Sequence, residues 1–256
     1  MKKLIEIEDL SYKKLWKQLN LSIEKNKFIT ISGPNNCGKT TLIRILNREI
    51  VQEKGIRINN KNIIDYKIEE YTKLVQCIIP LEIIFIENTL YEELLLYTSD
   101  KDKINNILDN LKIETIATKE FKTYTSKEII LSQLAIALIK NPKILLIDNI
   151  GIYFEEDEIE IIMDYLRHEQ EEQKLTIVWT TINLKESLKT DYLYILNDGV
   201  VALEGIPITI LEKDNIINKI GLNIPFMIDL SVKLKDYDLI DQMELDMNRM
   251  ADKLWK

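Results

Sequence analysis

The chain has 256 residues, enough for one large domain or two modest ones, with 46% hydrophobic and 30% charged residues, as in ordinary globular proteins. Its formal net charge of −8, without a stripe rich in Lys or Arg, argues against a nucleic-acid partner. Its two cysteines lie in no metal-ligand spacing, which favours a reducing compartment and excludes a disulfide framework. We recognise no targeting segment and no uncharged apolar run of the ~20 residues that span a bilayer, so we expect any membrane role to be peripheral.

The first part of the chain predicts strands around one helix. Residues 3–7 and 19–23 alternate apolar and polar side chains, as half-buried strands do. Residues 28–31 predict a buried strand, and residues 55–61 predict a strand that enters a tight turn. Between them, a helix is predicted by four apolar side chains at helical spacing: Leu42, Ile43, Ile45 and Leu46.

The rest of the chain predicts alternating helices and strands, followed by a helical tail. Helices are predicted over residues 102–111, 126–140 and 155–173. The apolar runs 143–148 and 175–180 are typical of strands buried on both faces of a parallel sheet. Residues 192–196 and 200–203 flank Asn197-Asp198-Gly199 as a hairpin. In the tail, Met243, Met247, Met250 and Leu254 are expected to form one stripe along a helix.

The strand at 28–31 and the helix after it enclose the most informative motif of the chain. It fits the phosphate-binding pattern G-x-x-x-x-G-K-[ST] at every specified position: Gly33, Pro34, Asn35, Asn36, Cys37, Gly38, Lys39 and Thr40, followed by Thr41. Gly33 and Gly38 let backbone N–H groups turn inward around a phosphate, and the new helix points its positive end at the same anion. Lys39 would reach the outer phosphates and the Thr40 hydroxyl would hold Mg²⁺. We therefore expect these nine residues to bind a nucleoside triphosphate; the alternative is an ordinary glycine turn.

The order of elements resembles the ATP-binding subunit of ABC transporters. The resemblance is carried by the phosphate loop, by Asn141-Pro142-Lys143 leading into the strand that ends at Asp148, and by the hairpin region 190–205. The tail segment 221–226, with Leu230 and Leu234, resembles the C-terminal extension of the energy-coupling-factor (ECF) branch, which drives uptake of vitamins and transition-metal ions. The resemblance covers nearly the whole chain.

This resemblance implies an α/β P-loop NTPase fold with ATP and Mg²⁺ as cofactors. We expect a nucleotide-binding domain over 1–205, with a mainly parallel core sheet, an antiparallel β subdomain and a helical subdomain at about 80–140, and a C-terminal helical extension over 206–256. Tyr12 matches the aromatic residue that stacks on adenine, although a strand-end tyrosine is equally often a packing residue. Asp148 matches the acid that holds Mg²⁺ through water, together with Thr40, although it could instead cap a helix.

Several positions depart from the family pattern, and we assign no catalytic residue. Asn149 stands where a glutamate should act as the base that orients the attacking water, and a neutral amide loses general-base help of roughly 10²–10⁴-fold. Ile182 stands where a histidine should sense the γ-phosphate, and the chain's single histidine, His168, lies in a charged helical stretch. The Mg²⁺-binding glutamine is missing near Pro80, with Gln76 as a displaced option.

The LSGGQ-type motif, which a cassette offers to its partner's ATP, aligns with residues 124–128. Its hydroxyl survives as Thr125 and its last position is Glu128, but both glycines are gone, which puts close backbone approach to a phosphate in doubt. Whether Thr125 and Glu128 act in a partner's ATP site stays open at this point.

Two functional hypotheses follow. In the first, the chain is the catalytically weak half of a dimer with a second ABC ATPase subunit, an intact paralogue, bound to a transmembrane transporter subunit on the cytoplasmic face of the membrane. In the second, it is a non-hydrolysing pseudo-ATPase that acts as a nucleotide-gated interaction module. A P-loop kinase or a DNA-processing ATPase is disfavoured, because there is no arginine-rich lid and no long coiled-coil insertion.

Overall fold

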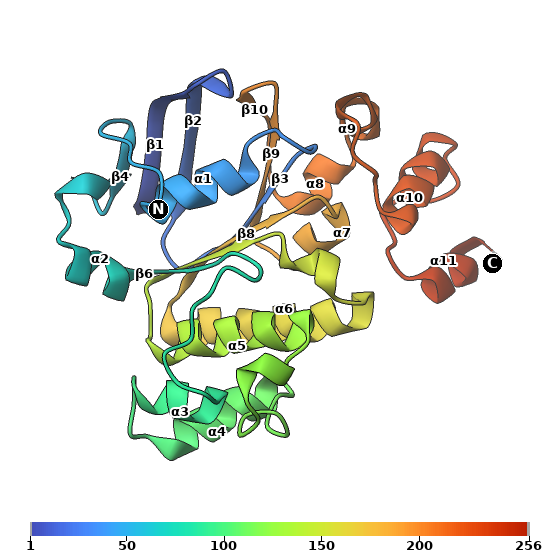
Figure 1. Ribbon diagram of the computed structural model, residues 1–256. Coiled ribbons are helices and arrows are strands. Elements are labelled where there is room, and N and C mark those ends of the chain that lie inside the picture. Colours follow the sequence, from blue (N-terminus) through green and yellow to red (C-terminus); the bar gives the residue numbers. More distant parts are fainter. Residues whose placement is uncertain (1, 255–256) are drawn as a thin grey trace.

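The computed structural model describes residues 2–254 as an α/β fold built around a six-stranded sheet (Figure 1). The strand order is β10–β9–β3–β8–β7–β6. The strands are β3 (Phe28–Ser32), β6 (Val75–Ile78), β7 (Ile144–Asp148), β8 (Thr176–Thr181), β9 (Tyr192–Asn197) and β10 (Val200–Gly205). All neighbours pair in parallel except β9 and β10, which form an antiparallel hairpin. The predicted mainly parallel core sheet is therefore confirmed.

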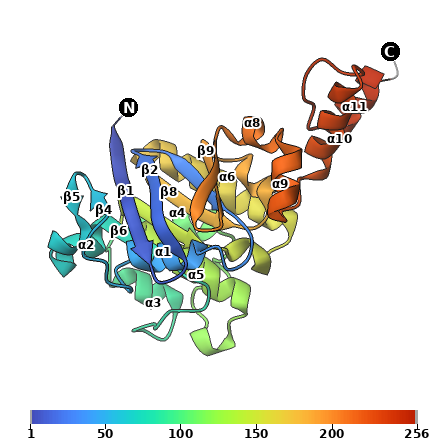
Figure 2. The same ribbon diagram turned by 90° about the horizontal axis from the view of Figure 1, so that it is seen from above.

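A second, antiparallel sheet lies beside the first and has the strand order β2–β1–β4–β5. Its strands are β1 (Lys3–Tyr12), β2 (Trp16–Glu24), β4 (Ile56–Ile58) and β5 (Lys61–Asn62). Helix α1 (Lys39–Leu46) lies between the two sheets, as Figure 2 shows from above. Its four predicted apolar side chains are buried in one core with strands of both sheets. Because α1 is buried on both sides, its first residues are held in place against the core sheet.

The opposite face of the core sheet is covered by helices. Helix α5 (Ser126–Ile139) and helix α6 (Glu156–Gln173) pack there in a second core, with α3 (Leu90–Leu95) and α4 (Lys101–Asn110) outside them. Because α5 is buried along nearly its whole length, its sequence is apolar on all sides. The short helix α2 (Ile68–Leu74) and three 3-10 turns, η1 (Ile63–Asp65), η2 (Phe121–Thr123) and η3 (Ile150–Tyr153), complete this part.

The chain after the core sheet is helical, as predicted. Helices α7 (Leu184–Ser187), α8 (Pro207–Leu211) and α9 (Asp214–Ile220) form a third core with β9 and α10 (Phe226–Asp236). The last helix, α11 (Met247–Leu254), lies at the far side of the tail (Figure 1). The predicted methionine stripe is wrong at its first position, because the Asp246 carboxylate accepts from the Arg249 N–H (2.8 Å) and the helix begins after Asp246, which leaves Met243 outside it.

The hairpin that ends the core sheet follows from its turn residues. Asp198 and Gly199 both have positive φ, at 47° and 82°, as a two-residue turn between twisted strands requires. The register pairs Val200 with Asn197 directly across the turn. The predicted hairpin is thus confirmed.

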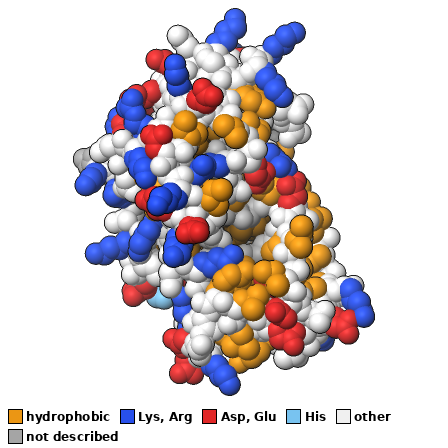
Figure 3. Space-filling view, turned by 60° about the vertical axis from the view of Figure 1, so that its left-hand side comes forward, with side chains coloured by type: hydrophobic (Ala, Val, Ile, Leu, Met, Phe, Trp, Pro, Cys, Tyr) orange, Lys and Arg blue, Asp and Glu red, His pale blue; other side chains and the backbone are white. Residues whose placement is uncertain are grey.

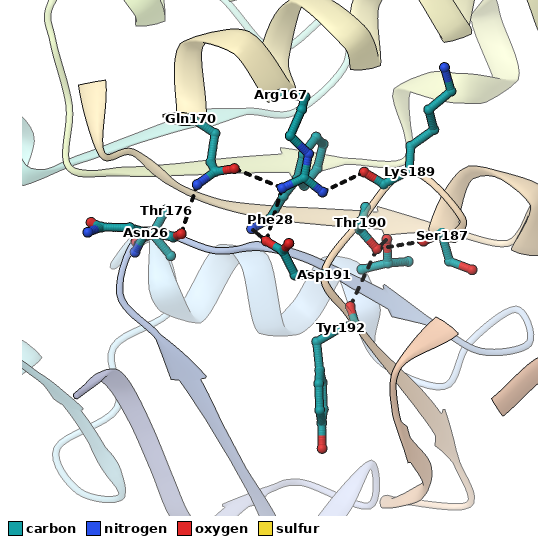
Figure 4. Close-up of polar contacts among 11 residues, drawn as sticks. Asn26, Phe28, Arg167, Gln170, Thr176, Ser187, Lys189, Thr190, Asp191 and Tyr192 are labelled. Atoms are coloured by element: carbon teal, nitrogen blue, oxygen red, sulfur yellow. Dashed lines mark hydrogen bonds and ion pairs between the residues drawn. The ribbon is translucent and has the colours of Figure 1, made fainter. Parts of the chain in front are cut away.

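A polar network joins the ends of the strands away from the phosphate loop (Figure 4). The Asp191 carboxylate accepts from the backbone N–H of Phe28 (2.7 Å) and from the Arg167 guanidinium (3.1 Å). Arg167 also donates to the Gln170 side chain (2.8 Å) and to the carbonyl of Lys189 (2.7 Å). The network therefore fixes the start of β3, the start of β9 and helix α6 relative to one another.

We predict that Asp191→Ala lowers the free energy of unfolding by about 1–3 kcal/mol, because it leaves the Phe28 N–H and the Arg167 guanidinium without their acceptor. Urea unfolding followed by circular dichroism measures the change. The matched control is Glu120→Ala, which removes an exposed ion pair with Lys122 and should change the stability by less than about 0.5 kcal/mol. Equal effects of the two variants would contradict a stabilising role of the network.

Candidate nucleotide-binding site

Two other residues, Leu196 and Trp16, lie very close to the backbone of the loop between β3 and α1. A Cβ atom at Gly33 would lie 2.3 Å from the carbonyl oxygen of Leu196, and one at Gly38 would lie 2.4 Å from Cζ2 of Trp16. Both glycines also have left-handed φ angles, at 148° and 107°. Only glycine satisfies both the space and the conformation, so the two specified glycines of the motif are structurally required.

Trp16 is a residue of this site that sequence reasoning missed. Its side chain is only 1% exposed, it lies against Gly38, and its indole N–H donates to the carbonyl oxygen of Cys37 (3.2 Å). Trp16 opens strand β2, in the other sheet and 22 positions before Gly38. No local pattern connects the two positions, since only the packing of one sheet against the other brings them together.

Lys39 lies folded over the loop that precedes it. Its side chain is 7% exposed, and the ammonium group donates to the carbonyl oxygens of Gly33 (2.6 Å) and Pro34 (3.0 Å). Both partners are neutral, so a phosphate oxygen would form the stronger, charge-assisted bond with the same ammonium group. The Cys37 sulfur lies 3.8 Å from the ammonium and is buried within the loop, as expected of a small filling residue.

An open cavity of about 660 Å³ lies in front of the loop and the start of α1. It is lined by Leu15, Asn35, Asn36, Gly38, Lys39, Thr40, Thr41, Asn149 and Ile182. Most of the predicted phosphate-loop residues thus form one wall of this cavity. Asn149 and Ile182, the two positions that depart from the family pattern, line the same cavity. Pro34 and Cys37 line a neighbouring hollow of about 380 Å³, beside the β9–β10 turn. Contact of these residues with the nucleotide stays a prediction.

Asp148 and Thr40 have the properties that a Mg²⁺ site needs. The Asp148 side chain is 5% exposed at the end of β7, and it accepts a hydrogen bond from the Thr180 hydroxyl (2.6 Å). No Lys or Arg of residues 2–254 forms an ion pair with this carboxylate. A buried carboxylate without a cationic partner is costly, and a hard divalent cation coordinated by oxygen atoms would relieve that cost. The oxygen donors are of the kind that Mg²⁺ prefers, but only Thr40 of the two residues lines the cavity, and joint coordination of Mg²⁺ by Thr40 and Asp148 stays a prediction.

Asn149 and Ile182 form a wall without a titratable group. Asn149 has a left-handed φ of 47°, and its backbone N–H donates to the carbonyl oxygen (3.0 Å) and hydroxyl (3.1 Å) of Thr180. Its side-chain oxygen is buried and has no hydrogen-bond partner within residues 2–254. Ile182 is 39% exposed and contributes only hydrocarbon. No Asp, Glu or His of the described chain lines this cavity, so none is placed to take a proton from water.

Tyr12 lies beside the site and not in the cavity wall. Its half-buried ring packs on Trp16, with ring centres 6.3 Å apart, and the Lys13 ammonium lies 5.0 Å from its centre. Leu15 lines the cavity instead. Stacking of Tyr12 on adenine stays a prediction.

The remaining predicted positions are occupied by contacts within the chain. Gln76 donates to the backbone carbonyls of Thr72 and Val75 at the end of α2, and it does not line the cavity. At the start of α5, the Glu128 carboxylate accepts from the backbone N–H (2.6 Å) and hydroxyl (2.8 Å) of Thr125 in a capping box. The hydroxyl that remains of the LSGGQ-type motif, that of Thr125, therefore already forms hydrogen bonds within its own helix.

The sequence profile of the ABC transporter family matches residues 16–150, which include the phosphate loop, the cavity residue Asn149 and the carboxylate of Asp148. The chain belongs to this family. An energy-coupling factor transporter ATP-binding protein from Methanosarcina acetivorans is 25% identical over 250 residues, which cover 91% of this chain and 90% of that protein.

Two solved structures share the fold of this ABC cassette. The protein cbiO1 from Clostridium perfringens, part of the ABC transporter complex cbiONQ, has a TM-score of 0.72 at 22% identity, and the match covers 90% of this chain and 99% of that protein. A dimeric ATP-binding cassette bound to ADP and phosphate has a TM-score of 0.69 at 21% identity, over 80% of this chain and 99% of its own.

The predicted α/β P-loop fold, the ABC assignment and the cofactors of such a cassette, ATP and Mg²⁺, are thereby confirmed. Within residues 2–254, no helix has both the length and the apolar character needed to cross a membrane.

We predict that Lys39→Ala weakens Mg-ATP binding about 10–100-fold, because a charge-assisted hydrogen bond to phosphate is worth about 1.5–3 kcal/mol. Isothermal titration calorimetry measures the dissociation constant. Lys122→Ala, which removes an exposed lysine of η2, serves as the control and should leave the constant unchanged. An unchanged affinity in Lys39→Ala would contradict the assignment of the phosphate loop.

Proposed function

We propose that this chain is the ATP-binding subunit of an ECF-type ABC transporter, coupling ATP binding and hydrolysis in a dimer to the uptake of a vitamin or metal ion. The proposal is supported by the ECF transporter protein that matches over nearly its whole length. It is carried by one observation: a single cavity joins Lys39 and Thr40 to Asn149 and Ile182. The first pair binds phosphate and metal, and the second offers no proton acceptor.

We propose further that this chain is the catalytically weak half of the dimer. Each composite site in such a dimer uses the phosphate loop of one chain and the LSGGQ-type segment of the other. Asn149 impairs the site built on this chain's loop, because an amide cannot accept the proton of the attacking water. The partner is then an intact paralogue that supplies its own base, while this chain supplies the segment capped by Thr125 and Glu128.

The second partner in this proposal is a transmembrane transporter subunit, with the chain bound at the cytoplasmic face of the membrane. Apolar side chains on the segment between β6 and α3 support such a contact, because Ile84 is 93% and Ile86 is 73% exposed. Leu95 and Leu96 at the end of α3 are also exposed. Figure 3 shows hydrophobic side chains gathering in the lower part of one face of the molecule.

Within the proposed division, residues 1–205 bind nucleotide and 206–256 form the helical extension.

We predict that the purified chain binds Mg-ATP and hydrolyses it negligibly by itself. In the complex reconstituted with its natural partners, Asn149→Glu should raise turnover at least about tenfold, because it restores a general base worth roughly 10²–10⁴-fold. A coupled assay of phosphate release measures both rates. Asn149→Gln is the matched control, since it has the size of glutamate without its basicity, and it should not raise turnover. Turnover by the single wild-type chain at the rate of a competent ABC ATPase would contradict the proposal.

The second candidate function is a nucleotide-gated interaction module that never hydrolyses ATP. The observation that favours it is that no Asp, Glu or His of the described residues lines the cavity. In this case the reconstituted complex stays inactive, also with Asn149→Glu, while bound Mg-ATP still strengthens association of the chain with its partner. The same assay therefore separates the two functions.

A further inference from the structure

A buried carboxylate lies behind the wall formed by Asn149 and Ile182. Glu186, on the short helix α7, is 5% exposed, and its Oε2 atom accepts from the indole N–H of Trp179 in β8 (2.6 Å). Its backbone N–H donates to the carbonyl oxygen of Asn183 (3.2 Å). Asn183 directly follows Ile182, and Trp179 lies three positions before it, so Glu186 contacts the chain on both sides of the turn that carries Ile182.

The same carboxylate packs against the segment that follows Asn149. A Cβ atom at Gly151 would lie 2.4 Å from Oε1 of Glu186, well inside van der Waals contact. Gly151 is also the one glycine of the seven whose φ is not positive. A side chain at this position would therefore displace the Glu186 carboxylate, which fills the space beside Gly151.

Glu186 has no cationic partner to explain its burial. Within residues 2–254 no Lys or Arg forms an ion pair with it, although Lys185 beside it pairs with Glu156 and Glu160. Burial raises the pKa of the Glu186 carboxyl, and the hydrogen bond from the Trp179 indole opposes this shift. A buried carboxylate that accepts from one neutral donor is costly, which argues for a role other than global stability.

We propose that Glu186 is a positioning residue that joins the turn after β8 to the segment after β7 and so sets the distance of Ile182 and Asn149 from the terminal phosphate of bound ATP. The inference rests on the proposed nucleotide site. Lys39 and Thr40 approach the triphosphate from the loop, and Asn149 and Ile182 complete the cavity at the carboxyl ends of β7 and β8. A shift of these two ends changes contacts with the γ-phosphate and leaves the loop that holds the other phosphates in place.

The test compares binding of Mg-ADP with binding of Mg-AMP-PNP, a slowly hydrolysed ATP analogue, by calorimetry on the full chain. In Glu186→Gln, one acceptor oxygen becomes an NH2 group that faces donors or the Gly151 backbone. We expect the affinity for Mg-AMP-PNP to fall roughly fivefold or more, and the affinity for Mg-ADP to change by less than about twofold. Gly151→Ala should have the same selective effect, because its methyl group displaces the carboxylate.

The matched control is Glu169→Gln. Glu169 is 8% exposed on α6, burial raises the pKa of its carboxyl too, and it lines no part of the cavity. Glu169→Gln should change the affinities for Mg-AMP-PNP and Mg-ADP by less than about twofold relative to the wild-type chain. Equal weakening of both nucleotides by Glu186→Gln, or no change in either, in a variant whose circular dichroism is native, would overturn the proposal.

A measurement without nucleotide tests the link between the two segments separately. Gly151→Ala should lower the melting temperature of the wild-type chain by several degrees, and by less than half as much in a Glu186→Ala background, where the methyl group finds space. Additive shifts would refute direct packing between the segments. If wild-type chain binds no Mg-ATP, the proposed function fails, while this comparison still decides whether Glu186 joins the two segments.

Discussion

The nucleotide site depends on the close approach of two other elements to the backbone of the phosphate loop. The Leu196 carbonyl of β9 meets the loop at Gly33, and the Trp16 ring of β2 meets it at Gly38, each at a distance that leaves no room for a side chain. One contact comes from the core sheet and the other from the antiparallel sheet. The loop is thereby clamped between the two sheets, and α1, buried between them, starts at a defined place with its N–H groups directed at the cavity.

The two walls of the cavity have diverged in chemistry. The loop wall carries a cation and a hydroxyl of the kind that a Mg-triphosphate requires, and the Asp148 carboxylate at the end of β7 lacks a cationic partner among the described residues. The other wall has an amide and an aliphatic side chain. Binding energy comes from charge and backbone dipoles, whereas hydrolysis needs a proton acceptor at one point. Binding can therefore occur without hydrolysis, which is the physical basis for the proposal that this subunit holds ATP and works through a partner.

Polar groups that are buried or half-buried hold both ends of the core sheet. At the end away from the cavity, Asp191 and Arg167 join the starts of β3 and β9 to α6 through an ion pair and hydrogen bonds. At the cavity end, Glu186 accepts from the Trp179 indole and lies against Gly151. Groups of this kind stabilise less than apolar packing of equal volume, but they specify one arrangement, because any shift leaves a buried polar atom without a partner.

The amino-acid sequence by itself predicted the phosphate loop, the buried strands at 28–31 and 143–148, the helix after the loop, the helices at 102–111 and 126–140 and the hairpin at Asp198 and Gly199, whereas α2 and α3 were not predicted. Each of the predicted elements follows from local spacing, apolar runs or turn residues. The resemblance to the family further implies that Asn149 and Ile182 stand where titratable residues are expected, which stays a prediction. The tertiary structure alone decided that Trp16 packs on Gly38, that Leu15 and not Tyr12 lines the cavity, and that Glu186 lies against Gly151. These contacts join segments from different strands and turns, and their geometry is set by how the sheets pack, which no local pattern of residues records.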